Sequence, residues 1–495
     1  MNVYLLYPDR DSKIEEALPG EKEELVRDLG ISPVFEIMGG GSDFIKTVVK
    51  STLLSPLTKI EEIVYRQRIL KDVIQNPDVV MRLYDLGDKA RNAERKSRFG
   101  FFTHHLGGIL YSAIELMRML LDFLRELREI AEKEGGKFSS PGFVRFFNMV
   151  KEELTPDYFA LIEDHLKRLE FRNGLLIMAE LGKGNKGKGY TLCKPPEKRM
   201  GILNHIFSKG EPSYTFTIDE RDESGERALS EIKERGINSV TNALAQSVEH
   251  VLWFFDTLKK ELAFYIGALN LFKYIDEMGG PITYPIPLPQ GELRYKLSAL
   301  YNPSLSITLG KPPVKNDLEV EGKRLFVITG ANGGEKSTFL RSIGTFHLMM
   351  QSGMFVCAER SEAPIQNGVF THFRRKEDKE MESGKLDEEL KRMERILTEV
   401  RAESLILFNE SFSSTNEKEG SQIATQIISA LIESRITVFF VTHMYKFAHD
   451  FYKEKRGDTM FLRAERKPSG LRTFKIISGA PETTGYTRDL VREGI

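Results

Sequence analysis

The sequence has few cysteines and almost no net charge. Only Cys193 and Cys357 occur among 495 residues, too few for a disulfide framework and typical of a reducing compartment. The 71 basic and 72 acidic side chains leave a formal net charge of −1. No global positive potential therefore attracts nucleic acid, and any contact with DNA must come from a local patch.

The sequence also lacks a membrane span and a secretory signal. Its longest apolar candidate, ITVFFV at residues 436–441, falls far short of the roughly 18 residues that a span requires. The N-terminus has no basic region followed by an apolar one. With 41% hydrophobic and 29% charged residues, the composition is that of a well-cored globular protein. These features predict a soluble, cytoplasmic protein without a membrane partner.

Long helical patterns dominate the first part of the chain. Apolar residues recur at helical spacing over 105–134, over 60–74 and over 237–277, which predicts amphipathic helices. The pattern over 237–277 is almost uninterrupted, and an unbroken helix of that length would extend about 60 Å. Such a helix is typical of a lever, a strut or a coiled coil.

An irregular insert at about residues 171–225 interrupts these helices. Two pieces, 174–179 and 214–218, have the composition of strands, and the run GKGNKGKG at 182–189 contains Lys183, Lys186 and Lys188. The run is either a flexible loop that touches phosphates or the solvated tip of a hairpin. The pattern alone favours the hairpin tip.

Near residue 300 the sequence pattern changes from long helical periodicity to short apolar runs separated by predicted helices. Residues 324–329, 404–408 and 437–441 are rich in β-branched and aromatic residues, as in strands buried on both faces. Four prolines at 281–290 exclude a helix there and mark a boundary. We predict a short N-terminal segment at 1–49, an all-α domain at 50–290, and an α/β domain with a mainly parallel sheet at 291–495.

The strongest local motif begins where the first of these strands ends. In TGANGGEKSTFLRS, Gly330, Lys336 and Ser337 have the spacing of a P-loop, a glycine-rich turn that cradles phosphates at a helix N-terminus. Glu335 stands where a glycine is expected just before the lysine. Its carboxylate would repel a phosphate unless the side chain swings into solvent. Taken alone, the loop is compatible with a nucleotide site or with an ordinary structural turn.

Polar residues follow the next two buried strands. Asn409 and Glu410 stand where a Walker B motif places an Asp that holds the Mg²⁺ shell and a Glu that orients water, and His443 follows the third strand. Asn409 attracts a cation less strongly than Asp. We expect Lys336 and Glu410 to face one triphosphate at the ends of neighbouring strands. Ser383 opens a helix between the two motifs, as an ordinary N-cap or as part of an anion site.

Taken together, these segments resemble the MutS family. VITGANGGEKSTFLRSIG resembles the family's P-loop, SLILFNESFSSTNEKEG its Walker B region, VTHMYKF its histidine switch and GAPETTGYTRDLVREG its closing segment. SPLTKIEEIVYRQRIL is similar to the start of its lever domain. The resemblance implies an ABC-type ATPase domain preceded by helical levers, with a role in mismatch repair or related DNA repair.

The resemblance also implies roles for individual residues. Glu410 would orient water and His443 would sense the γ-phosphate, while Ser337 and Asn409 would lie near Mg²⁺. ATP would be bound by the following residues: Gly330, Asn332, Gly333, Gly334, Lys336, Ser337 and Thr338. Ser383 and Gly384 would complete the site of the partner in a homodimer.

Departures from the family pattern leave three functional hypotheses. About 45 residues precede the lever-like segment, too few for the mismatch-recognition and connector domains. The leading hypothesis is therefore a dimeric MutS-like ATPase whose closure on ATP moves levers on duplex or branched DNA, without reading mispairs. Glu335 and Asn409 motivate a second hypothesis, a dimeric scaffold with an impaired nucleotide site. The neutral net charge motivates a third, an ABC-type motor that acts on protein partners.

Overall fold

The computed structural model describes residues 1–12, 20–98, 106–172, 174–193, 214–215, 217–219, 221–330, 335–375, 385–466 and 472–482. The chain forms two compact units, each built from separate stretches. We call residues 1–3, 82–136 and 145–259 the helical unit, and residues 4–81, 137–144 and 260–495 the sheet unit. The domain boundaries at residues 50 and 291 stay a prediction.

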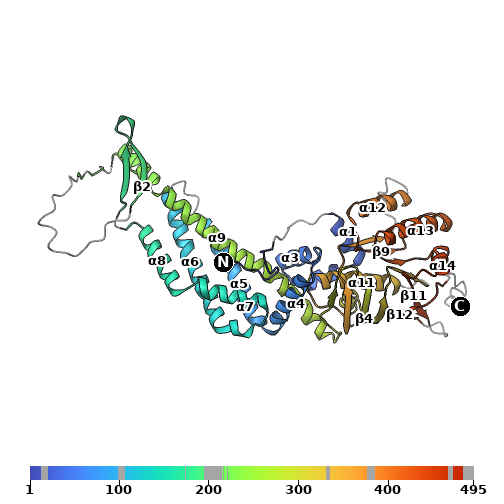
Figure 1. The fold of residues 1–495 in the computed structure, drawn as a ribbon. Helices are drawn as coiled ribbons and strands as arrows, with labels where there is room; N and C mark the ends of the chain where they lie inside the picture. The colour runs from blue at the N-terminus through green and yellow to red at the C-terminus, as the bar shows by residue number, and fades with distance from the viewer. Residues whose placement is uncertain are drawn as a thin grey trace. The chain divides into compact units, whose positions relative to one another are not determined.

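Long helices form the core of the helical unit (Figure 1). It contains most of α5 (Pro77–Arg98) and α7 (Pro141–Glu153), all of α6 (Leu106–Glu134) and α8 (Pro156–Leu169), and α9 (Glu223–Glu277) as far as Lys259. The apolar stripe of α6 is buried, from Leu110 through Ile130, and α6 packs against α8. The helix predicted over 105–134 is thus confirmed.

The helix α9 is longer than its apolar pattern indicated. It begins at Glu223 rather than near Ile237 and runs for 55 residues. Most side chains between residues 223 and 236 are exposed, so no apolar stripe indicated this part. An aspartate marks the start instead, because Asp222 Oδ1 accepts a hydrogen bond from the backbone N–H of Gly225 at 2.9 Å.

The insert contains a two-stranded antiparallel hairpin, β1 (Ile177–Leu181) with β2 (Gly187–Leu192). The strand predicted at 214–218 is wrong, since its described residues form no strand. The tight turn at Lys183–Asn185, where Gly184 has φ 69°, instead pairs β1 with the segment that directly follows it. Lys183, Lys186 and Lys188 lie at or beside this tip with exposed side chains.

The larger sheet of the sheet unit has six strands in the order β12-β11-β6-β10-β9-β8. Its strands are β6 (Leu325–Thr329), β8 (Val369–Phe373), β9 (Leu405–Asn409), β10 (Thr437–Val441), β11 (Thr459–Arg466) and β12 (Arg472–Ser478). Among these strands only the β11–β12 pair is antiparallel. The three strands predicted from apolar runs are therefore confirmed as β6, β9 and β10.

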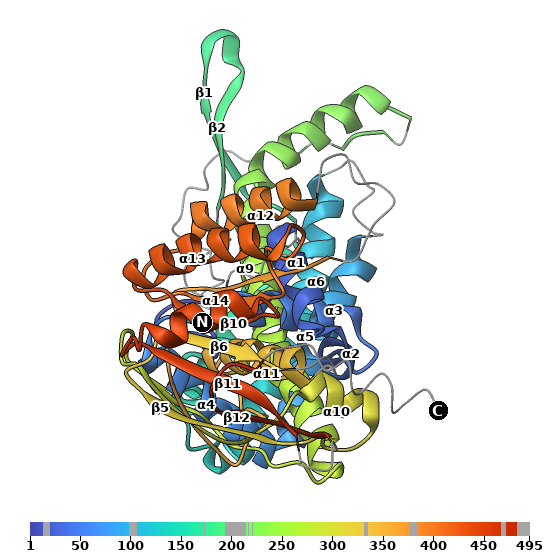
Figure 2. The same ribbon diagram turned by 90° about the vertical axis from the view of Figure 1, so that its right-hand side faces the viewer.

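Helices cover both faces of this sheet (Figure 2). On one face, α12 (Lys385–Glu399), α13 (Glu417–Glu433) and α14 (Tyr445–Lys453) bury apolar side chains against Val327, Phe408 and Phe440. On the other face, α11 (Glu335–Gln351) packs against the sheet. Phe326 and Phe439 stack with their ring centroids 4.0 Å apart. Because successive strand residues point to opposite faces, burial on both sides explains why these strands read as continuous apolar runs.

A second sheet of four strands was not foreseen. It has the order β3-β7-β4-β5 and contains β3 (Ile286–Leu288), β4 (Arg294–Leu300), β5 (Asn316–Glu321) and β7 (Arg360–Pro364). The proline-rich segment that excludes a helix contributes β3, which pairs with β7. The remaining helix of this region is α10 (Pro303–Leu309).

Residues 4–53 form an integral part of the sheet unit. They contain α1 (Gly20–Leu29), α2 (Ser32–Gly39) and α3 (Asp43–Leu53), and α4 (Ile60–Gln75) follows. The helix α3 approaches α9 closely at Gly267, where a Cβ atom would lie 2.4 Å from Val49 Cγ2. Across all the described residues, no helix combines the length and apolarity needed to cross a membrane.

A buried carboxylate on α9 holds the N-terminal segment. Glu261 is fully buried, and its oxygens accept hydrogen bonds from the backbone N–H groups of Leu5, Leu6 and Ser12 at 2.6, 3.0 and 2.8 Å. Burial raises the pKa of Glu261 to about 7, against the opposing effect of these three donors. The site therefore exchanges a proton near neutral pH.

We predict that Glu261 makes stability pH-dependent between about pH 4.5 and 7. The pKa of Glu261 is higher in the folded state than its ordinary value of 4.5. Its contribution to the free energy of unfolding is therefore fully present below about pH 4.5 and is lost as the pH rises through about 7. The loss is of the order of 3 kcal/mol. Urea unfolding at several pH values should show this decline in the wild type and a flatter profile in Glu261→Gln. Glu277→Gln, at the exposed end of the same helix, should keep the wild-type profile; parallel profiles for all three proteins would contradict the assignment.

Candidate functional site

The carboxyl ends of three parallel strands carry the candidate site. Strand β10 lies between β6 and β9, and Val441 is in register with both Ile328 and Asn409. The segments that follow these strands therefore leave the sheet at the same edge. The expectation that Lys336 and Glu410 follow neighbouring strands is wrong, because β10 separates them. This order places His443, which follows β10, between the two other segments.

The first segment leaves β6 through a constrained glycine. Gly330 has φ 121°, and a Cβ atom there would lie 3.1 Å from Ala464 Cβ on β11. A residue with a side chain would be both strained and crowded at this point. Asn332, Gly333 and Gly334, which the sequence assigns to phosphate binding, lie outside the described residues. The chain is described again from Glu335, the first residue of α11.

Lys336 is a buried cation at the start of α11. Its ammonium group donates a hydrogen bond to the Gly330 carbonyl oxygen at 2.8 Å, so the side chain folds back over the end of β6. Burial lowers the pKa of Lys336, and the nearby carboxylates of Glu335 and Glu410 oppose that shift. Lys336 in turn lowers the pKa of Glu410, as expected for two opposite charges that lie near each other.

A hydrogen bond joins the P-loop helix to the end of β9. The hydroxyl of Ser337 donates to Asn409 Oδ1 at 3.0 Å, across 72 positions of sequence. Thr338, the next residue, is partly buried on the same first turn. The two oxygens of Ser337 and Asn409 are of the kind that Mg²⁺ prefers, together with water and phosphate oxygens. They fit a Mg²⁺ ion that a bound nucleotide would bring.

Glu410 and His443 form a second contact at the same edge. His443 Nε2 lies 2.9 Å from Glu410 Oε1, and both side chains remain partly exposed. The hydrogen bond from His443 holds the pKa of Glu410 below its usual value, despite the opposing effect of burial, and Lys336 contributes in the same direction. Glu410 is therefore ionised at neutral pH and can accept a hydrogen bond from water.

Glu335 does not swing into solvent as the sequence suggested. Its side chain is buried with 9% of its surface exposed, and Oε2 has no hydrogen-bond partner among the residues that the structure describes. A helix N-terminus attracts a carboxylate, which accounts for its position on the first turn of α11. The Glu335 carboxylate thus lies close enough to Lys336 to affect its pKa.

The sequence assigned two further residues, Ser383 and Gly384, which lie outside the described residues. The helix expected to follow them is confirmed as α12, beginning at Lys385. Over the described ranges, no group of three or more His, Cys, Asp or Glu side chains is arranged to hold a metal ion.

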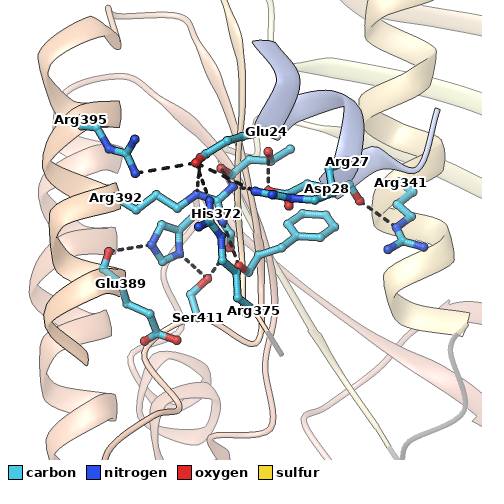
Figure 3. Close-up of polar contacts among 12 residues, drawn as sticks. Glu24, Arg27, Asp28, Arg341, His372, Arg375, Glu389, Arg392, Arg395 and Ser411 are labelled. Atoms are coloured by element: carbon cyan, nitrogen blue, oxygen red, sulfur yellow. Dashed lines mark hydrogen bonds and ion pairs between the residues drawn. The ribbon is translucent and has the colours of Figure 1, made fainter. Parts of the chain in front are cut away.

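The sequence did not predict a polar cluster that contains Ser411, the residue after Glu410 (Figure 3). Arg392 on α12 and Asp28 on α1 form a buried ion pair, and His372 on β8 contacts Ser411, next to Glu410. These residues are far apart in sequence and belong to no spaced motif. Of these residues, only His372 is unusual in the sequence, because it is a histidine within the apolar pattern of a strand.

Two family models match the chain. The MutS2 N-terminal domain matches residues 58–278, and MutS domain V matches residues 326–487. MutS domain V is a P-loop ATPase domain, and its match contains Lys336, Asn409, Glu410 and His443.

Curated relatives give the same result. The chain is 27% identical to human MutS protein homolog 4 over 292 residues, which are 56% of this chain and 30% of that protein. It is 31% identical to the DNA mismatch repair protein MutS of Petrotoga mobilis over 234 residues, 46% of this chain and 28% of the relative. For the protein of the same name from Thermotoga maritima, the identity is 30% over 172 residues, 34% and 22% of the two chains. The chain thus spans less than a third of the length of these relatives. Together, the matched domains and relatives show that this chain belongs to the MutS family.

Proposed function

We propose that this chain is an ATPase that couples ATP binding and hydrolysis to DNA binding, as a dimer. The observation that carries the ATPase proposal is the hydrogen bond between Ser337 and Asn409. It joins a P-loop helix to a Walker B strand. Lys336 precedes Ser337 on that helix, and Glu410, which contacts His443, follows Asn409. The match to MutS domain V covers all of these residues.

Each described side chain has a task in this proposal. Lys336 would leave the Gly330 carbonyl and bind phosphate oxygens, since a buried ammonium gains more from a phosphate than from a neutral carbonyl. Glu410, ionised and oriented by His443, would align the attacking water. His443 would detect the γ-phosphate through its contact with Glu410. A bound Mg²⁺ near Ser337 and Asn409 would neutralise charge that develops on the phosphates.

The dimer and its levers extend the same proposal. Ser383 and Gly384 immediately precede α12 and would complete the nucleotide site of the partner. The long helices of the helical unit would act as levers, and the exposed lysines at the β1–β2 tip would meet the DNA backbone. Closure of two ATPase domains on ATP would then change the position of the levers.

We predict that Mg-ATP binding and hydrolysis separate in two variants. Lys336→Ala should lose binding, because the main positive charge at the phosphate site disappears. Glu410→Gln should bind Mg-ATP with nearly wild-type affinity but hydrolyse it about 100 times more slowly, because the amide orients water poorly. Calorimetric titration and a phosphate-release assay measure the two properties. Unchanged binding and turnover in Lys336→Ala would exclude this edge of the sheet as the nucleotide site.

We predict that DNA binding is strongly salt-dependent and involves the hairpin tip. The logarithm of the affinity should fall linearly with the logarithm of salt concentration. Replacing both Lys183 and Lys186 by Ala should weaken binding across all sequences and reduce the slope by about 1 for each phosphate that is no longer neutralised. Fluorescence anisotropy with duplex and branched DNA measures both. The matched control is the double variant Lys167→Ala, Arg168→Ala, which removes two positive charges from the last turn of α8. If the wild type binds no DNA at low salt, with or without ATP, DNA binding is removed from the proposal.

A second candidate function, a dimeric scaffold with an impaired nucleotide site, is favoured by the buried carboxylate of Glu335. This charge next to the phosphate site should weaken nucleotide binding. We predict that Glu335→Gly tightens the binding of Mg-ATP by tenfold or more, about 1.4 kcal/mol. Titration calorimetry of both proteins decides between the functions. Binding only by the glycine variant supports the scaffold, whereas micromolar binding and turnover by the wild type rule it out.

A further inference from the structure

The turn that carries Glu410 has an unfavourable backbone. Glu410 has φ 56° and Phe412 has φ 62°, values in the left-handed region that residues with a Cβ atom rarely adopt. Two such residues within three positions persist only where their surroundings hold them in place. The Glu410 N–H donates to the Val441 carbonyl oxygen at 2.8 Å, and the rest of the support for its backbone comes from the contacts that fix Ser411–Ser414, the turn that follows β9.

The carboxylate of Glu389 on α12 makes two of these contacts. Its Oε2 accepts a hydrogen bond from the Phe412 backbone N–H at 3.0 Å, and its Oε1 accepts one from the Ser414 hydroxyl at 2.9 Å. The Phe412 N–H belongs to one of the two residues with a left-handed backbone, and the Phe412 side chain is fully buried. Glu389 thus clamps the turn from the side of α12.

His372 on β8 holds the same turn from the sheet (Figure 3). Burial lowers the pKa of His372 to about 4, so the ring is neutral at pH 7. Its Nε2 lies 2.9 Å from the Glu389 carbonyl oxygen, which can only accept, and therefore carries the hydrogen. Nδ1 lies 2.7 Å from Ser411 Oγ, and the Ser411 hydroxyl also donates to the backbone carbonyl oxygen of His372. The ring also stacks on Phe412, with centroids 5.3 Å apart.

The helix that carries Glu389 is anchored by α1. Arg392, less than one turn beyond Glu389, pairs with Asp28 and donates hydrogen bonds to the carbonyl oxygens of Phe373 and Thr371 at 3.0 and 3.1 Å. Asp28 also accepts a hydrogen bond from the Thr371 hydroxyl at 2.9 Å. Both charged side chains of the pair are 6% exposed. The helix α1, at residues 20–29, lies outside both family matches, so this anchor is a feature that the matches do not assign.

We propose that Glu389 is a positioning residue for Glu410, holding the Ser411–Ser414 turn in the backbone conformation that aims the Glu410 carboxylate at the nucleotide site. This inference rests on the proposed ATPase function. Without the Glu389 carboxylate, the Phe412 N–H loses its acceptor, and the His372–Ser411 contact and the burial of Phe412 are left to hold the left-handed turn. Lys336 and Ser337 lie on α11, so phosphate binding does not depend on this turn.

The test compares ATP turnover and nucleotide binding of the full chain. Glu389→Ala should lower kcat by about 10- to 100-fold, as expected when a reacting group is displaced by a fraction of an ångström to 1 Å. KM and the calorimetric affinity for Mg-ATP should change by less than about threefold. Glu389→Gln should recover most of the lost turnover, since its amide oxygen can accept from Phe412 and its NH₂ group can donate to Ser414 Oγ. Glu394→Ala, on the exposed face of the same helix, should behave as the wild type.

Ser414→Ala is a milder second variant that keeps the test possible if Glu389→Ala does not fold. It removes only one of the two hydrogen bonds of Glu389 and should therefore give a smaller fall in kcat. Thermal unfolding of each variant accompanies the kinetics. The proposal is overturned if Glu389→Ala turns over ATP at the wild-type rate, if its KM rises while kcat stays constant, or if Glu389→Gln recovers nothing. It also fails if Glu394→Ala, the control variant, loses as much activity as Ser414→Ala while both proteins remain folded. A wild type that binds no Mg-ATP at all would instead remove the proposed function, and is recognised before any variant is compared.

Discussion

The parallel pairing of β10 between β6 and β9 is the constraint on which the candidate site depends. Because Val441 is in register with both Ile328 and Asn409, three chain segments that are distant in sequence leave the sheet at one edge. The first turn of α11, the Asn409–Glu410 turn and His443 can then meet. The hydrogen bond from Ser337 to Asn409 and the contact between His443 and Glu410 are consequences of this register, and helices packed on both faces hold it.

Two substitutions relative to the usual motifs have different consequences at this edge. Asn409 keeps the geometry of a Walker B residue, because its amide oxygen accepts the Ser337 hydroxyl as a carboxylate oxygen would, but it contributes no charge for a cation. Glu335 keeps the helix start and adds a buried negative charge beside Lys336. The two substitutions thus leave the hydrogen bond to Ser337 in place and add a carboxylate next to the ammonium group of Lys336. The balance between these effects distinguishes an active ATPase from a scaffold.

The sequence predicted the parts of the fold whose residues repeat with a regular period. The buried strands β6, β9 and β10 and the helix α6 were visible because their environments impose a continuous apolar run or a helical stripe. The first turns of α9 were missed because exposed helix carries no such stripe. The four-stranded sheet was missed because strands such as β4 and β5 alternate buried with exposed residues and so carry no continuous apolar run. In the site, Lys336, Ser337, Asn409 and Glu410 were predicted by spacing. Asp28, His372, Glu389 and Arg392 were not, because only folding brings these residues together.

If α11 and the ends of β9 and β10 face a single bound nucleotide, a crystal structure of the chain with Mg²⁺ and a non-hydrolysable ATP analogue will reveal it. We expect phosphate oxygens within hydrogen-bond distance of Lys336 Nζ, the metal ion beside the oxygens of Ser337 and Asn409, and the Glu410 carboxylate directed at the γ-phosphate. A nucleotide bound elsewhere on the chain, or phosphates that contact neither Lys336 nor Ser337, would contradict it.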